Sequence, residues 1–281
     1  MSKPTGNLFP PGHFYSPIPA IDDLERDKSR IFGPPPRELP GIELDEPGQL
    51  ALLQIFSEQY YPDMPFDENP SGGLRYGFAN TAYAHTDAIF LHCMIRHARP
   101  KRIIEVGSGY SSCVTLDTNE RFFGGSIECT FIEPYPKLLK SLLKPEDAER
   151  IKVIGTRVQD VDLTAFEALT ANDILFIDST HVSKTGSDVN YLFFEVLPRL
   201  KPGVLVHLHD IFYPFEYPER WVLQGRAWSE AYLLRAFLQF NREFRVVLFA
   251  NYIVTFHRAL LLKMLPKCAG NFGGNIWMRR A

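Results

Sequence analysis

Acidic and imidazole side chains end two of the apolar runs in this sequence. Asp178 ends one run and is followed by His181, while His209 and Asp210 end a later run. If both runs are neighbouring parallel strands, their carboxyl ends share one edge of a sheet. We therefore expect these four side chains to lie close together, where they could perform proton or metal chemistry.

Three interpretations of this group remain open. In the first, Asp178, His209 and Asp210 bind a divalent metal ion that holds and acidifies a hydroxyl group. In the second, no metal is needed and His181, His209 and Asp210 are catalytic, with a histidine taking a proton near neutral pH. In the third, the residues are structural and Asp178 caps a loop.

A glycine turn and two glutamates indicate a second site at the same edge. Gly107 and Gly109 follow an apolar run and precede a predicted helix, so the backbone there can approach a ligand closely. Glu105 lies within that apolar run, where its carboxylate needs a cationic or hydrogen-bonding partner. Glu133 ends the next run, and a carboxylate at this place accepts both hydroxyl groups of a ribose in nucleoside-binding folds.

The elements that must position these residues alternate along the chain, which is typical of a parallel sheet covered on both faces. Two helices, over 47–60 and 81–96, are expected before the sheet. The predicted strands are 102–106, 128–133, 151–155, 174–178, 204–209, 244–250 and 275–280. The predicted helices between them are 111–119, 135–143, 163–169, 188–200 and 231–241. The fold class is therefore α/β, with a seven-stranded sheet.

From about residue 76 to the C-terminus, the chain resembles the class I S-adenosylmethionine-dependent methyltransferases, in the branch labelled methyltransferase domain 24. The resemblance implies a Rossmann-like sheet with helices on both faces and S-adenosylmethionine as the cofactor. The motifs that carry it are Ile104-Glu-Val-Gly-Ser-Gly-Tyr-Ser-Ser112, Phe131-Ile-Glu-Pro-Tyr135, the segment 174–190 and His207-Leu-His-Asp-Ile-Phe212.

The resemblance also implies a set of cofactor-binding residues. Glu105 would contact the methionine amino group, Glu133 the ribose, and Gln159 with Asp160 the adenine, while Tyr83 would cover the cofactor from the other side. The full set is Tyr83, Glu105, Gly107, Ser108, Gly109, Ser111, Glu133, Gln159, Asp160 and Asp178.

The metal expectation rests on a similarity to metal-dependent catechol-type O-methyltransferases. Those enzymes carry Asp at the fourth strand and Asp-Asn at the fifth. This chain has Asp178 at the fourth strand but His209-Asp210 at the fifth, which leaves the ligand set and the metal open.

Methyl transfer to a hydroxyl group of a small molecule, such as a sugar or natural product, is the expected activity. A nitrogen acceptor is an alternative. A nicotinamide-dependent oxidoreductase is less favoured, because its Gly-rich motif would need glycine where Ser112 stands. A metal-dependent enzyme of other chemistry on the same fold also remains open.

Composition excludes several other classes of function. A net charge of −3 and the lack of long basic runs argue against nucleic acid as a partner. No signal-peptide pattern or membrane-length apolar run is found, so we expect a cytoplasmic protein, compatible with a homo-oligomer. The scattered cysteines are expected to be reduced and buried: Cys93, Cys113, Cys129 and Cys268.

The chain divides into an N-terminal arm with a helical extension, 1–75, and a methyltransferase domain, 76–281. Prolines in the first 48 or so residues disfavour helix and sheet, so this arm should be extended. It carries apolar anchors such as Phe14, Tyr15 and Ile21, which are expected to dock on the folded body over the active site.

Overall fold

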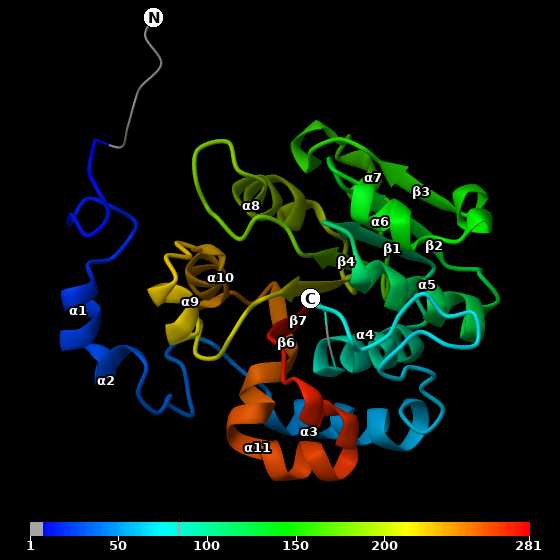
Figure 1. Ribbon diagram of the computed structural model, residues 1–281, viewed down its shortest axis with the longest axis horizontal. Helices are drawn as coiled ribbons and strands as arrows, with labels where there is room; N and C mark the ends of the chain where they lie inside the picture. Colours follow the sequence, from blue (N-terminus) through cyan, green and yellow to red (C-terminus); the bar gives the residue numbers. More distant parts are fainter. Residues whose placement is uncertain (1–7, 84) are drawn as a thin grey trace, which may run out of the picture.

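One seven-stranded sheet forms the centre of the computed structural model, which describes residues 8–83 and 85–281 (Figure 1). The strand order is β3-β2-β1-β4-β5-β7-β6. The first five strands are parallel, and β7 runs antiparallel between β5 and β6. The strands are β1 Arg102–Val106, β2 Glu128–Ile132, β3 Ile151–Ile154, β4 Ile174–Ile177, β5 Leu205–His209, β6 Phe244–Phe249 and β7 Asn275–Arg280. The predicted Rossmann-like seven-stranded sheet is confirmed.

Helices cover both faces of this sheet, and its central strands β4 and β5 are buried along their whole length. Figure 1 shows α4 and α5 on one face and α8 on the other. The larger helices are α3 Glu46–Ile55, α4 His85–Ala98, α5 Tyr110–Phe123, α10 Glu230–Leu238 and α11 Ala250–Met264. The shorter ones are α6 Lys137–Leu142, α7 Thr164–Glu167, α8 Asp188–Tyr191 and α9 Glu219–Leu223. Short π- and 3₁₀-helical turns continue α8 to Arg199. All four cysteines are free and buried.

Helix α11, between β6 and β7, was not predicted from the sequence. It buries Ile253 and Leu261 and contacts α3 and β7. His257 within it has non-helical backbone angles, so two shorter helical segments meet at a kink. Such a kink weakens the regular spacing of apolar residues by which a helix is found.

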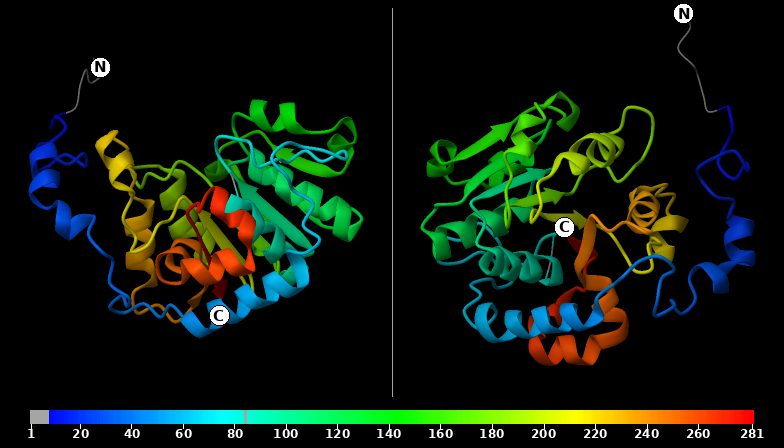
Figure 2. Two further views of the ribbon diagram at one scale, coloured as in Figure 1. Left: turned by 60° about the horizontal axis from the view of Figure 1, so that its bottom comes forward. Right: turned by 180° about the vertical axis from the view of Figure 1, so that it is seen from behind.

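The N-terminal arm differs from the prediction in two ways. It forms two short helices, α1 Ile21–Arg26 and α2 Lys28–Ile31, in the proline-free stretch between residues 19 and 34. Its aromatic anchors do not dock, since Phe14 is 81% and Tyr15 64% exposed. Instead the arm lies at the side of the molecule next to α9, where Lys28 pairs with Glu219 (Figure 2). Residues 1–7 of the predicted arm, and residue 84 of the predicted helix 81–96, lie outside the described residues.

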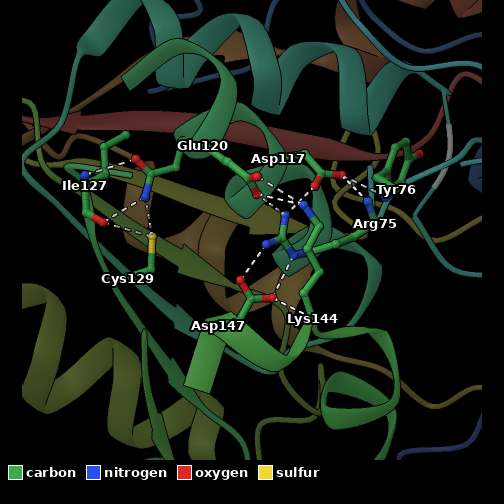
Figure 3. A network of polar contacts seen from close by, with 9 residues as sticks. Arg75, Tyr76, Asp117, Glu120, Ile127, Cys129, Lys144 and Asp147 are labelled. Carbon is green, nitrogen blue, oxygen red and sulfur yellow. Dashed lines mark hydrogen bonds and ion pairs between the residues drawn. The ribbon is translucent and has the colours of Figure 1, made fainter. Parts of the chain in front are cut away.

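A buried ion-pair network ties the segment before α4 to α5 (Figure 3). The Arg75 guanidinium, 2% exposed, donates hydrogen bonds to Asp117, Asp147 and Glu120. A second oxygen of Asp117 accepts the backbone amides of Arg75 and Tyr76, both at 2.8 Å. The Tyr76 hydroxyl then donates to the carbonyl of Tyr83 at 2.6 Å. The network therefore fixes the start of the loop that reaches the carboxyl edge of the sheet.

Arg75→Met should lower the free energy of unfolding by about 3–5 kcal/mol, because it leaves buried carboxylates without their cation. Urea unfolding followed by circular dichroism would measure this. The matched control is Arg102→Met, which breaks an exposed pair with Glu128 and should cost less than about 1 kcal/mol. Equal losses in both variants would contradict the role given to Arg75.

Candidate active site

The register of the parallel strands aligns three predicted site residues at the carboxyl edge of the sheet. Val106 pairs with Ile177, and Ile177 pairs with Leu208. The residues that follow these positions, Gly107, Asp178 and His209, consequently lie side by side. The backbone amide of Asp178 donates to the carbonyl of Val106 at 2.9 Å, which extends the pairing one residue beyond the strands.

A cavity of about 400 Å³ opens at one half of this edge. Four of the predicted cofactor-binding residues line it: Gly107, Glu133, Gln159 and Asp178. Glu133 accepts the backbone amide of Ser108 at 3.3 Å and that of Tyr135 at 2.7 Å, so its carboxylate is held at the mouth of the glycine turn. The segment 179–188 forms the opposite wall, with Ser179, Thr180 and Lys184.

Gly107 could not be replaced without displacing this edge. Its φ is +79°, which disfavours a side chain, and an added Cβ would lie 1.8 Å from the carbonyl oxygen of Asp178. The glycine therefore allows β1 and β4 to end in contact.

The other predicted cofactor residues are not part of the lining of this cavity. Glu105 is fully buried and accepts the hydroxyls of Ser111 and Ser112 at 2.6 and 2.9 Å. Burial raises the pKa of Glu105 to about 8, against the effect of these hydrogen bonds. Its second carboxylate oxygen, Oε2, is buried without a hydrogen-bond partner among the described residues. The remaining predicted residues outside the lining are Tyr83, Ser108, Gly109, Ser111 and Asp160.

Two of these residues already contact other protein groups. Tyr83 is buried, its hydroxyl donates to the carbonyl of Asp87, and its ring lies 5.0 Å from that of His209. Asp160 forms an exposed ion pair with Arg157 at 2.9 Å. Tyr83 thus packs against His209, and Asp160 pairs with a surface cation, while the cofactor contacts of both residues stay predictions.

A second cavity, of about 600 Å³, opens on the other side of Asp178. At its inner end lie Asp87 and His209, which are buried, and Asp210, whose side chain is 18% exposed. Aromatic side chains form much of the remaining wall: Phe212, Trp221 and Phe272. Since Asp178 lines both cavities, it marks the place where two ligands would meet.

Carboxylates surround both His181 and His209. His181 lies between Glu230, 2.8 Å from Nδ1, and Asp178, 3.3 Å from Nε2. His209 lies between Asp178, 3.3 Å from Nδ1, and Asp87, 3.6 Å from Nε2. The structure thus brings together all four residues predicted from the two strand ends.

Glu230 and Asp87 were not predicted to belong to this group. Both are buried, although Glu230 lies in the first turn of α10, where an acidic residue is usually exposed. Asp87 did carry a signal, because it is a charged residue within a largely apolar helix.

These neighbours change the protonation expected for the histidines. Burial alone would lower the pKa of His181, but Asp178 and Glu230 outweigh it and raise the pKa to about 10. The pKa of His209 is also raised well above its usual value, by Asp178 and Asp210 against the effect of burial. The neighbouring carboxylates thus favour the protonated form of both imidazoles, in the direction opposite to the neutral base that was expected.

The two aspartates respond in opposite directions. Burial would raise the pKa of Asp178, but His209 and His181 hold it well below its ordinary value. For Asp210 burial prevails and raises the pKa, although both histidines oppose it. Asp210 is consequently the better proton acceptor of the two.

The predicted metal ligands do not converge on one point. Asp178 approaches Nδ1 of His209, whereas Asp210 lies 3.9 Å from Nε2 of the same ring. The two carboxylates thus lie beside different nitrogens of the ring, so a metal ion bound to one nitrogen would not contact both. Within residues 8–83 and 85–281, no group of three or more His, Cys, Asp or Glu side chains could hold a metal ion. The metal remains a prediction from the sequence.

Comparison with known proteins identifies the family. A family model described as a methyltransferase domain matches residues 104–211, which run from β1 to just beyond Asp210. An uncharacterized protein from Archaeoglobus fulgidus is 39% identical over 179 residues, or 62% of this chain and 79% of that protein. The chain belongs to the class I S-adenosylmethionine-dependent methyltransferases, in the branch that this domain defines.

Solved structures with a similar course of the chain are distant in sequence. The SAH-bound methyltransferase PaMTH1 of Podospora anserina is 14% identical, with 99% of this chain and 100% of that chain covered and a TM-score of 0.47. The O-methyltransferase TomG of Streptomyces achromogenes, in complex with SAM, is 16% identical, with 92% and 96% covered and a TM-score of 0.45. At these levels of similarity, nothing is assigned to this chain from their ligands.

No helix in the described part of the chain is long and apolar enough to cross a membrane.

Proposed function

We propose that this methyltransferase transfers a methyl group from S-adenosylmethionine to a hydroxyl group of a small molecule. The observation that carries the proposal is the pair of cavities that share Asp178. One cavity is bounded by the glycine turn and Glu133, and the other by the carboxylate and imidazole group. A volume of about 600 Å³ for the second cavity suits a small-molecule acceptor.

The smaller cavity fits the methyl donor by the chemistry of its lining. The Glu133 carboxylate is suited to accept hydrogen bonds from ribose hydroxyls. Glu105, with one buried oxygen free of partners among the described residues, is suited to receive a cationic amino group through the turn. Asp178, which remains ionised, offers a negative charge beside the positively charged sulfur of the donor.

We assign proton removal to Asp210. The acceptor oxygen forms a bond to the methyl carbon, the carbon–sulfur bond breaks with its electron pair left on sulfur, and the hydroxyl proton passes to Asp210. Burial raises the pKa of this carboxylate, which makes it a stronger base than an exposed aspartate. His181 and His209 are positively charged in this assignment, and they hold Asp178 and Asp210 in place.

Glu133→Ala should weaken the binding of S-adenosylhomocysteine at least about 10-fold, or about 1.4 kcal/mol, because hydrogen bonds to a charged acceptor are lost. Isothermal titration calorimetry would measure the affinity. The control is Glu128→Ala, at the exposed start of the same strand, which should leave the affinity unchanged. An unchanged affinity in a well-folded Glu133→Ala protein would contradict the cofactor assignment.

A further inference from the structure

An arginine stands at the mouth of the acceptor cavity without an anionic partner. Arg226 lines this cavity, and it is the only Lys or Arg among the described residues that do so. It is exposed and forms no ion pair with any described Asp or Glu side chain. The inner end of the cavity, in contrast, carries the carboxylates of Asp87, Asp178 and Asp210 beside the imidazole of His209.

Aromatic rings hold the Arg226 guanidinium in place. Its central carbon lies 4.2 Å from the ring centroid of Trp221 and 5.1 Å from that of Trp228. The backbone amide of Arg226 also donates to the carbonyl of Trp221 at 3.1 Å, so the turn after α9 is closed. Cation–π contacts with two tryptophans restrict the side chain while leaving its N–H groups free to bind a ligand.

The two ends of the cavity therefore carry opposite net charge, because three carboxylates outnumber the single imidazolium of His209 at the floor and Arg226 stands at the mouth. The anionic group of a ligand would be repelled by the floor and attracted by Arg226. The opposite end of the ligand would then point inward. Between the two ends, Phe212, Trp221 and Phe272 offer flat apolar surfaces. A single guanidinium matches the two oxygens of a carboxylate, and the lining has no second Lys or Arg for a doubly charged phosphate.

We propose that the acceptor is a hydroxylated aromatic acid, whose carboxylate binds Arg226 while its hydroxyl group points toward Asp210. The proposal rests on the assigned methyl transfer and adds to it the class of acceptor. Arg226 is then the residue that selects acids over neutral analogues of the same shape.

The test uses hydroxybenzoic and hydroxycinnamic acids of different lengths, each paired with its primary amide. Release of S-adenosylhomocysteine by the full-length protein would give kcat/KM for every compound. We expect the best acid to exceed its amide at least 10-fold, and Arg226→Gln to reduce this acid-to-amide ratio at least 10-fold. Arg220→Gln is the control, since Arg220 lies in the same α9 region but does not line the cavity.

Tryptophan fluorescence gives a second measurement. Trp221 and Trp228 flank Arg226, whereas Trp277, the third tryptophan, is fully buried in β7. Binding of the acid should change the emission of wild-type protein and of Arg220→Gln, but much less that of Arg226→Gln.

Amides methylated as well as acids, or an acid preference that survives Arg226→Gln, would overturn the proposal. It is equally overturned if no acid is methylated by protein that binds S-adenosylhomocysteine in calorimetry. Failure to bind S-adenosylhomocysteine would instead contradict the proposed methyl transfer, so the two failures are distinguishable.

Discussion

Replacing Asp210 with asparagine is expected to lower kcat by about 10²- to 10⁴-fold, the range that a general base contributes. The amide keeps the shape of the side chain but cannot take the acceptor proton. Binding of S-adenosylhomocysteine should be nearly unchanged, because Asp210 lines only the acceptor cavity. Product formation would be followed with the best acceptor found by screening hydroxylated compounds.

The same change at a surface carboxylate, Asp162→Asn, is the control and should leave kcat unaltered, since Asp162 is exposed. In wild-type protein the rate should rise with pH through the raised pKa of Asp210, so activity is lost on the acid side. A loss centred on neutral pH would point to a histidine base instead. Full activity of Asp210→Asn at every pH would remove Asp210 from the mechanism.

Chelation separates the direct base from the metal alternative. If Asp210 takes the proton itself, EDTA should leave the rate unchanged. If EDTA abolishes activity and Mg²⁺ or a transition ion restores it, the predicted ligands Asp178, His209 and Asp210 bind a metal ion. The assignment of Asp210 as a direct base is then wrong. Elemental analysis of untreated protein gives an independent reading of the same question.

The proximity of Asp178 and His209 could be predicted because parallel strands place their carboxyl ends at one edge. The alternation of apolar runs and helices was enough to locate both residues. The chemical state of the histidines could not be predicted in this way. It depends on Glu230, 2.8 Å from His181 although the two are far apart in the sequence, and on Asp87, which comes from a helix that precedes the sheet.

Elements of the sheet were predicted more accurately than the segments around it. The strands β1 and β7 have the predicted bounds, since their apolar runs are bordered by clear turn residues. In the arm, by contrast, an extended chain was predicted from the many prolines, and the proline-free stretch that forms α1 and α2 was overlooked. Exposed aromatics such as Phe14 were expected to be buried, because a sequence shows which residues favour burial but not whether a surface is near enough.

Replacing Glu230 with glutamine is the second change for which we expect a large effect, here on the pH dependence of the rate. Glu230→Gln removes the negative charge that stabilises the His181 imidazolium, so the pKa of His181 should fall from about 10 by about one unit or more. The imidazolium is present below this pKa and is lost as pH rises through it. The alkaline limb of the rate profile, near pH 10 in wild-type protein, should therefore move to lower pH. At pH 9, kcat should fall about 2-fold if the pKa drops by one unit and about 10-fold if it drops by two.

Glu46→Gln is a matched control, because Glu46 lies 2.9 Å from His257 in another histidine–glutamate pair, which is outside both cavities. It should leave the rate profile unchanged. The His181 ring protons, followed by NMR over the same pH range, would report the pKa directly. A purely structural Glu230 would lower the thermal stability of the Glu230→Gln protein without moving the alkaline limb or the NMR titration. If the alkaline limb and the NMR titration both move while the affinity for S-adenosylhomocysteine is retained, Glu230 positions His181 and keeps it protonated.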